Sequence, residues 1–182
     1  MALEGKKIAF LVASEGIEQV ELTEPWATVE QGAGQPVLLV AGGDASQVQA
    51  YNHLDKADTF DVDLPVSRAN PEDYDGLVLP GGVTNGDQVR TDPTAVAFAA
   101  AFLETGKPVA VVCHGGWVLV ETGLLQGRRM TSWPSLQTDV RNAGGEWVDE
   151  EVVVDTSGAG PLVSSRNPDD LPAFTKAIAD VF

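Results

Sequence analysis

The stretch that decides the fold is KPVAVVCHGG, residues 107–116. Its first part, Lys107–Cys113, is a short apolar run rich in valine, which is typical of a strand buried on both faces of a parallel sheet. The glycines that follow predict a sharp turn into a helix, expected over His114–Leu125. A strand that turns tightly into a helix presents the residue at the turn, Cys113, at the sheet edge, which is the layout of a nucleophile elbow.

Further strands and helices are expected on both sides of this segment. Short apolar runs predict strands at Lys7–Ala13, Pro36–Val40, Gly76–Leu79, Arg129–Ser132, Glu151–Asp155 and Leu162–Ser165, and a hairpin or extension from Val48–Tyr51 and Thr59–Leu64. Helical spacing predicts helices at Ile17–Gly32, with a kink or restart at Pro25, at Asp92–Thr105 and at Asp169–Phe182. This alternation predicts an α/β sandwich, in which a mostly parallel sheet carries helices on both faces.

Length and composition exclude several classes of protein. With 182 residues, 43% hydrophobic and 21% charged, the chain suits one ordinary folded domain rather than a collagen-like, disulfide-scaffold or disordered protein. Its net charge of −16 should repel nucleic acid and anionic membranes. Its apolar runs fall far short of the roughly 20 residues that span a membrane. Met1–Lys7 lacks a signal-peptide layout. We therefore expect a cytoplasmic protein that binds neither nucleic acid nor membrane.

Three segments should meet where ligands bind open parallel sheets, at the carboxyl ends of the strands. They are Ala13–Glu21, Leu79–Gly82 and Val112–Gly116. In the third segment the thiol lies at the start of a helix, where the positive end of the helix dipole favours the thiolate. We therefore expect Cys113 to be a nucleophile with a lowered pKa. The alternative is that this single cysteine is a small hydrophobe in a buried strand.

His114 can pair with Cys113 only if the backbone turns between them, because adjacent strand residues point to opposite faces. Otherwise His114 is a histidine of the first helical turn, bonded to nearby backbone. Gly81 and Gly82 leave backbone N–H groups free for an oxyanion hole, in which Gly115 has a part.

Each acidic residue near these segments has a functional and a purely structural interpretation. Glu18 and Glu21 are three residues apart, so they share a helix face and either one can reach the thiol. A protonated carboxyl there would donate to a thiolate, whereas the alternative is a pair of solvated surface acids. Asp87 is a further candidate, with the alternative that it is the N-cap of a short helix.

The histidine count excludes other enzyme classes. The chain contains only His53 and His114, and no histidine follows position 114. A triad with a distant histidine after the nucleophile, as α/β-hydrolases and glutamine amidotransferases require, therefore cannot be built. His53 is expected at the surface or at an interface. Because HExxH, clustered His/Cys and Walker A motifs are all missing from the sequence, we predict neither a metal site nor a cofactor.

Five motifs together resemble the PfpI family, which belongs to a wider superfamily that includes the parkinsonism-associated protein deglycase. They are EQVEL (18–22), LPGG (79–82), AVVCHG (110–115), TSWP (131–134) and AGGEWVD (143–149). The resemblance runs from Lys6 to the terminal helix. It implies a flavodoxin-like three-layer sandwich, one class I glutamine-amidotransferase-like domain over residues 1–182, and oligomers built from dimers.

The resemblance also implies roles for individual residues. Cys113 matches the family's nucleophile, His114 its adjacent histidine, and Glu21 the acid that contacts the cysteine, with Glu18 one turn away. Trp133 matches an aromatic residue that lines the pocket. Asp87 matches an acid that completes a Cys-His-acid set from a neighbouring subunit in PfpI-type proteases.

The activity implied is a cysteine-dependent stress-response hydrolase, most simply a glyoxalase or protein deglycase acting on methylglyoxal or its adducts. Two alternatives remain open at this point. One is an intracellular cysteine peptidase, and the other is a non-enzymatic redox sensor or chaperone that uses oxidation of Cys113. The expected partners are a small aldehyde, or a glycated or peptide substrate, and further copies of the chain in a homodimer or larger homo-oligomer.

Overall fold

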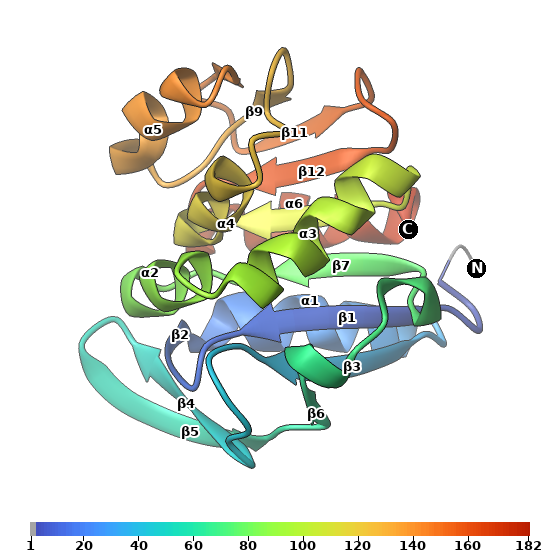
Figure 1. The fold of residues 1–182 in the computed structure, drawn as a ribbon, viewed down its shortest axis with the longest axis vertical. Helices are drawn as coiled ribbons and strands as arrows, with labels where there is room; N and C mark the ends of the chain where they lie inside the picture. Colours follow the sequence, from blue (N-terminus) through green and yellow to red (C-terminus); the bar gives the residue numbers. More distant parts are fainter. Residues whose placement is uncertain (1–2) are drawn as a thin grey trace.

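The computed structural model describes residues 3–182, so the first two residues of the domain expected over 1–182 lie outside it. In this part of the chain a seven-stranded sheet has the order β11-β12-β8-β7-β1-β3-β6 (Figure 1). Its strands are β1 (Lys7–Val12), β3 (Gln35–Val40), β6 (Leu64–Pro65), β7 (Gly76–Leu79), β8 (Val109–Val112), β11 (Val152–Asp155) and β12 (Leu162–Ser165). Every pairing is parallel except that of β11 with β12.

The sheet separates two hydrophobic cores because neighbouring strand residues point to opposite faces. In β1, Phe10 packs into one core and Leu11 into the other, and both side chains are buried. In β8, Val111 and Val112 divide between the two cores in the same way. The central strands are therefore apolar on both sides, which is why they appear in the sequence as continuous apolar runs.

Helices cover both faces and complete a flavodoxin-like three-layer α/β sandwich (Figure 1). One core takes side chains from α1 (Gln19–Gln31) and α6 (Leu171–Val181). The other takes them from α2 (Val83–Arg90), α3 (Pro93–Thr105), α4 (Gly116–Glu121) and α5 (Gln137–Asn142). The predicted mostly parallel sheet with helices on both faces is thus confirmed.

Two small sheets flank the main one. β2 (Glu15–Glu18), β4 (Gln47–Asn52) and β5 (Asp55–Asp61) form a three-stranded sheet, and β9 (Arg129–Met130) pairs with β10 (Glu146–Trp147). β4 and β5 are antiparallel, so the expected hairpin is present. β2 pairs with β4, which brings the hairpin beside the chain that leaves β1 (Figure 1).

The structure corrects several expected boundaries. The first helix begins at Gln19 rather than at Ile17, because Ile17 pairs with Ala50 in the small sheet, and it continues through Pro25 without a restart. The second hairpin strand covers Asp55–Asp61 rather than Thr59–Leu64, since Leu64 joins the edge of the main sheet. A short helix near Asp87 was considered only as an alternative, and α5 was not predicted; both helices are short and polar.

The helix expected over His114–Leu125 is also shorter than predicted. A 3₁₀ turn at Cys113–Gly115 precedes α4, which ends at Glu121.

No helix within residues 3–182 is both long enough and apolar enough to cross a membrane.

Candidate active site

A cavity of about 440 Å³ lies beside the carboxyl ends of β1, β7 and β8. The three segments predicted to meet do so here. Glu18 and Glu21 come from the chain after β1, Gly82 from the chain after β7, and Cys113 and His114 from the chain after β8. Parallel strands end at the same edge of the sheet, so residues distant in sequence converge there.

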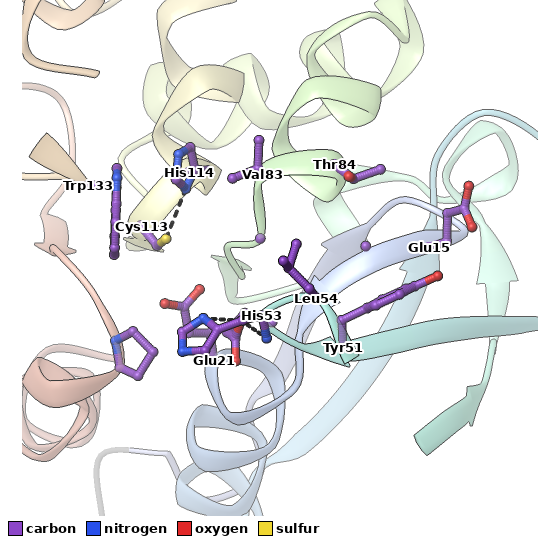
Figure 2. Close-up of a pocket in the computed structure, with 14 residues that line it drawn as sticks. Glu15, Glu21, Tyr51, His53, Leu54, Val83, Thr84, Cys113, His114 and Trp133 are labelled. Atoms are coloured by element: carbon purple, nitrogen blue, oxygen red, sulfur yellow. Dashed lines mark hydrogen bonds and ion pairs between the residues drawn. The ribbon is translucent and has the colours of Figure 1, made fainter. Parts of the chain in front are cut away.

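Cys113 and His114 form a close pair although they are adjacent in the chain. Sγ of Cys113 is 3.1 Å from Nδ1 of His114 (Figure 2). This contact is possible because Cys113 has φ 59°, the left-handed region that non-glycine residues rarely adopt. The backbone turn that the sequence analysis required between these two residues is therefore present.

Close packing around Cys113 fixes this turn. A Cβ atom on Gly115 would lie 2.6 Å from the carbonyl oxygen of Leu79 and 2.8 Å from that of Pro80, so only glycine fits against the end of β7. Gly86 of α2 packs equally closely against the backbone of His114. Gly115 does not line the cavity, and its contribution is to let the elbow lie close to the neighbouring strand.

Glu21 is fully buried yet lines the cavity, so the reading of it as a solvated surface acid is wrong. Neither carboxyl oxygen has a partner of full hydrogen-bond geometry within residues 3–182. Burial raises the pKa of Glu21 to about 8, and the nearby charge of Glu18 adds to the rise; the Cys113 thiol and the backbone of Gly81 act in the opposite direction. At neutral pH the Glu21 carboxyl is mostly protonated and can donate a hydrogen bond.

The expected lowering of the pKa of Cys113 is wrong for this structure. Burial raises the pKa of the thiol, and an ionised Glu21 raises it further, whereas the backbones of Gly82 and His114 lower it by less. A helix start alone favours the thiolate, but a residue only 6% exposed loses most of its hydration, and this loss disfavours the charged form. Cys113 is thus held as a thiol whose proton must be removed when the sulfur reacts.

His114 is suited to take that proton. Burial lowers the pKa of His114 to about 4, so its ring is neutral at pH 7 and one ring nitrogen is free to accept. Its ring stacks on that of Trp133 with centroids 5.5 Å apart, and Trp117 lies on another side at 5.1 Å. The backbone N–H of Trp133 also donates to the carbonyl of Cys113, so Trp133 is part of the pocket wall as predicted.

Glu18 lies at the junction of β2 and α1 and is held by the β4–β5 hairpin. Its carboxylate accepts a hydrogen bond from the backbone N–H of His53 at 3.1 Å, and Nδ1 of the same histidine is 3.6 Å away. His53 has an exposed side chain, as expected for a surface residue, but it also lines the cavity (Figure 2). Sequence spacing predicted the approach of Glu18 to the site and missed the hairpin that holds it.

Gly81 and Gly82, the glycines predicted to form an oxyanion hole, belong to the loop that follows β7. A Cβ atom on Gly81 would collide with the Glu21 carboxyl and with Cβ of Cys113, and Gly82 has φ 97°. Glycine is therefore required at both positions for the loop after β7 to pass this close to the cysteine. Gly82 lines the cavity directly, whereas Gly81 lies behind Glu21 and Cys113.

Asp87 is not brought to this site. It is an exposed residue inside α2, it does not line the cavity, and the N-cap of that helix is Gly82, so the N-cap reading is also wrong. The residue of this segment that faces inward is Asn85, which sequence analysis missed. Its buried side chain accepts from the N–H of Ala13 at 2.7 Å and donates to the carbonyls of Pro80 and Gly81 at 3.0 Å each. The sequence signal that could have identified Asn85 is its position three residues after the Gly81-Gly82 pair that follows β7.

Candidate metal ligands are not clustered in this region. Among residues 3–182, no group of three or more His, Cys, Asp or Glu side chains is arranged to hold a metal ion. The chemistry available to the described site therefore consists of a thiol, a neutral imidazole and a protonated carboxyl around one cavity.

The chain is similar in sequence to one known protein family and to several of its members. Residues 6–181 match the DJ-1/PfpI family. A deglycase of Pyrococcus horikoshii is 41% identical over 170 residues, which cover 93% of this chain and 95% of that protein. Protein/nucleic acid deglycase 2 of Escherichia coli is 37% identical, with 94% of each chain covered.

Solved structures agree with the fold. A two-domain protein of Anabaena variabilis, described as containing DJ-1/ThiJ/PfpI-like and ferritin-like domains, superposes with a TM-score of 0.86 at 33% identity. The match covers 96% of this chain and 49% of that longer one. The chain therefore spans about half the length of this structural relative.

Proposed function

Because the chain belongs to the DJ-1/PfpI family, we propose that it is a cysteine-dependent hydrolase that removes methylglyoxal from its adducts, with Cys113 as the nucleophile. The names of the deglycases from Pyrococcus horikoshii and Escherichia coli support this choice of substrate class. Free methylglyoxal is the simplest substrate of the same chemistry.

The observation that carries the proposal is the set of groups around one sulfur atom. Nδ1 of the neutral His114 is 3.1 Å from Sγ of Cys113, and the buried carboxyl of Glu21 lines the same cavity. A thiol with an adjacent base is the arrangement that nucleophilic catalysis requires. A mostly protonated carboxyl supplies the acid.

The first step forms a carbon–sulfur bond. Sγ of Cys113 attacks the carbon of the adduct that bears the nitrogen, and Nδ1 of His114 accepts the thiol proton. The carbon–nitrogen bond breaks, and the molecule that carried the adduct leaves as a free amine. It receives its proton from the side of the cavity where Glu21 lies. The product is a hemithioacetal on Cys113. With free methylglyoxal the same hemithioacetal forms by addition to the aldehyde.

The second stage is an internal redox change followed by hydrolysis. A proton moves from the first carbon of the hemithioacetal to the second by way of His114 or Glu21, so that the first carbon is oxidised and the second reduced. The resulting 2-hydroxy thioester is hydrolysed by one water molecule, which releases lactate and restores the thiol. The net reaction of the adduct is the addition of water, which gives the free amine and lactate, and it needs no external oxidant or cofactor.

The direct test compares purified wild type with Cys113→Ser. Lactate is measured after incubation with free methylglyoxal and with a methylglyoxal-treated peptide. We expect lactate from both substrates with wild type, and a rate reduced by at least roughly a hundredfold in Cys113→Ser. A parallel assay follows peptide-bond cleavage by mass spectrometry.

The outcomes separate the three functions that the sequence left open. Cleavage of peptide bonds without lactate would replace deglycase chemistry by a peptidase activity. Absence of any turnover, combined with ready oxidation of Cys113 by peroxide, would favour the redox sensor. Equal lactate production by wild type and Cys113→Ser would remove the cysteine from the mechanism.

A further inference from the structure

The imidazole of His114 lies between two tryptophan rings. Its centroid is 5.5 Å from that of Trp133, on which it stacks, and 5.1 Å from that of Trp117 in the first turn of α4. Trp133 lines the cavity, whereas Trp117 does not. Trp117 therefore packs against the histidine without reaching a molecule bound in the cavity.

A base that takes a proton from a nucleophile is generally oriented by a third group, most often through a hydrogen bond to its second ring nitrogen. In His114 the ring nitrogen Nδ1 lies beside Sγ of Cys113. Within residues 3–182 no side chain or carbonyl bonds to the other nitrogen, Nε2. In this part of the chain the orientation of the imidazole therefore depends on the two indoles that enclose it.

Trp117 is itself held by two other helices. Its Nε1–H donates to Oδ2 of Asp139 in α5 at 2.8 Å. The guanidinium of Arg90 in α2 lies over its ring, with Cζ 5.3 Å from the ring centroid, and Nε of Arg90 donates to Glu121 at 2.9 Å. Trp133, by contrast, is 37% exposed, and its indole makes no hydrogen bond within the described residues. Trp117 is thus the more firmly held of the two indoles.

We propose that Trp117 is a positioning residue for His114 and that Asp139 holds it in place. The indole keeps the imidazole turned with Nδ1 toward the thiol, and Arg90 supports the indole from α2. The inference rests on the proposed function, in which His114 accepts the thiol proton. It extends the site from the residues that line the cavity to the junction of α2, α4 and α5.

The same packing keeps water from the imidazole. His114 is 6% exposed, and this burial lowers its pKa to about 4. The titratable groups on the elements around it are Cys113, Glu18, Glu21 and His53 at the cavity, Asp87 and Arg90 of α2, Glu121 of α4 and Asp139 of α5. The lowering comes from burial rather than from these groups. Removal of the indole would admit water and raise the pKa toward its ordinary value of 6.5.

The test compares Trp117→Leu with Trp26→Leu, a matched control. Trp26 of α1 is also half-buried, and its Nε1–H also donates to a carboxylate, that of Glu30 at 3.1 Å. Its ring lies 5.1 Å from that of Phe10, the same separation as between Trp117 and the imidazole, but it packs against the other core. Trp26→Leu therefore removes the same kinds of contact without touching His114.

Titration of the His114 ring by NMR is the first measurement, and it needs no substrate. The chain has two histidines, so His53→Gln assigns the signals. In wild type the pKa should be about 4, and the neutral ring should carry its proton on Nε2 because Nδ1 faces the thiol. Trp117→Leu should titrate at least about one pH unit higher and show both neutral tautomers as the ring turns. Trp26→Leu should match wild type.

Steady-state kinetics with free methylglyoxal is the second measurement. Trp117→Leu should lower kcat roughly tenfold with KM within about twofold of wild type, because Trp117 does not line the cavity. The acid limb of kcat/KM should move to higher pH together with the titration of His114. Trp117→Phe, which keeps an aromatic ring beside the imidazole, should recover most of kcat.

The role of Asp139 is tested by two variants of that residue. Asp139→Asn keeps an oxygen that accepts the indole N–H and should behave as wild type, whereas Asp139→Leu should shift kcat and the His114 titration in the same direction as Trp117→Leu. Asp139→Leu also carries the test if Trp117→Leu fails to fold. Glu104→Gln, which removes an exposed acid of α3 away from the cavity, should change none of these readouts.

The outcomes separate this inference from the proposed function. An unchanged titration and a single tautomer of His114 in Trp117→Leu would overturn the positioning role even if kcat falls, and so would an equal shift in Trp26→Leu. Identical behaviour of Asp139→Asn and Asp139→Leu would overturn the part assigned to Asp139. Absence of lactate from wild type, with the titration of His114 shifted in Trp117→Leu, would overturn the deglycase function alone.

Discussion

The side chain of Asn85 joins the end of β1 to the loop after β7, with its oxygen 2.7 Å from the backbone nitrogen of Ala13. Its amide group donates to two carbonyls of the LPGG loop, so one buried side chain ties together two of the three segments that form the candidate site. The loop carries Gly81, on which a Cβ atom would lie 2.5 Å from Cβ of Cys113, so Asn85 bonds to the part of the loop that packs against the cysteine.

Asn85→Ala should therefore destabilise the protein. The change leaves the buried N–H of Ala13 and the carbonyl of Pro80 without their partners, and the carbonyl of Gly81 keeps only the N–H of Glu18. We expect the free energy of unfolding in urea to fall by roughly 2–4 kcal/mol. Asn142→Ala, at the exposed end of α5, is the matched control and should cost less than about 0.5 kcal/mol. Equal losses in the two variants would show that the bridge of Asn85 is dispensable.

The rate of adduct hydrolysis should have a bell-shaped dependence on pH. Activity needs His114 neutral, so it should fall as pH drops through about 4, and it needs Glu21 protonated, so it should fall as pH rises through about 8. Steady-state kcat/KM between pH 3.5 and 10 measures both limbs. Glu21→Gln, which keeps a hydrogen-bond donor, should shift or remove the alkaline limb. An unchanged alkaline limb in that variant would assign it to another group.

Stability should also depend on pH through Glu21. Its pKa is about 8 in the folded chain against an ordinary value of 4.5, so between these values the unfolded chain loses a proton that the folded chain keeps. Each pKa unit is worth about 1.4 kcal/mol, so the free energy of unfolding should fall by up to a few kcal/mol as pH rises through this window. Urea titrations at pH 5 and pH 8 should show a smaller fall for Glu21→Gln than for wild type. Glu104→Gln should behave as wild type.

Alkylation of Cys113 should report the raised pKa of the thiol directly. In wild type the rate of reaction with iodoacetamide should still be rising above pH ~8.5, the ordinary pKa of a cysteine. Above pH 8, where the Glu21 carboxylate opposes the thiolate, Glu21→Gln should react several-fold faster than wild type. A wild-type rate that already levels off near pH 6 would mean that the backbone donors of Gly82 and His114 outweigh burial.

Assembly remains a prediction from the sequence. We expect a homodimer or larger oligomer, and because Asp87 is exposed and away from the cavity, it can act only on a neighbouring subunit's site. Sedimentation over a range of protein and salt concentrations tests the first point. For the second, Asp87→Asn should lower kcat at least tenfold if the acid completes a partner's site. A fully active monomer would exclude Asp87 from the mechanism.

Sequence by itself determined the central sheet and the position of the cysteine. Strands buried on both faces are continuous apolar runs, so Gly76–Leu79 and Leu162–Ser165 have the same bounds in the structure as in the prediction. The carboxyl ends of parallel strands lie at one edge of the sheet. This rule alone predicted that Cys113, Glu21 and Gly82 lie close together, and all three line the cavity. These features follow from local patterns, because burial of a central strand on both faces leaves a continuous apolar run in the chain.

Only the tertiary structure decided how the site is charged and what surrounds it. The pKa values of Cys113 and Glu21 depend on how much water the packed chain excludes, and that quantity is set by contacts between elements distant in sequence. The hairpin that brings Leu54 to the cavity, and the bridge made by Asn85, are also long-range contacts. A polar residue has no periodic signature that distinguishes an inward position from a solvated one. The sequence therefore identified the candidate nucleophile, whereas the packing of the folded chain set its protonation and the shape of the pocket around it.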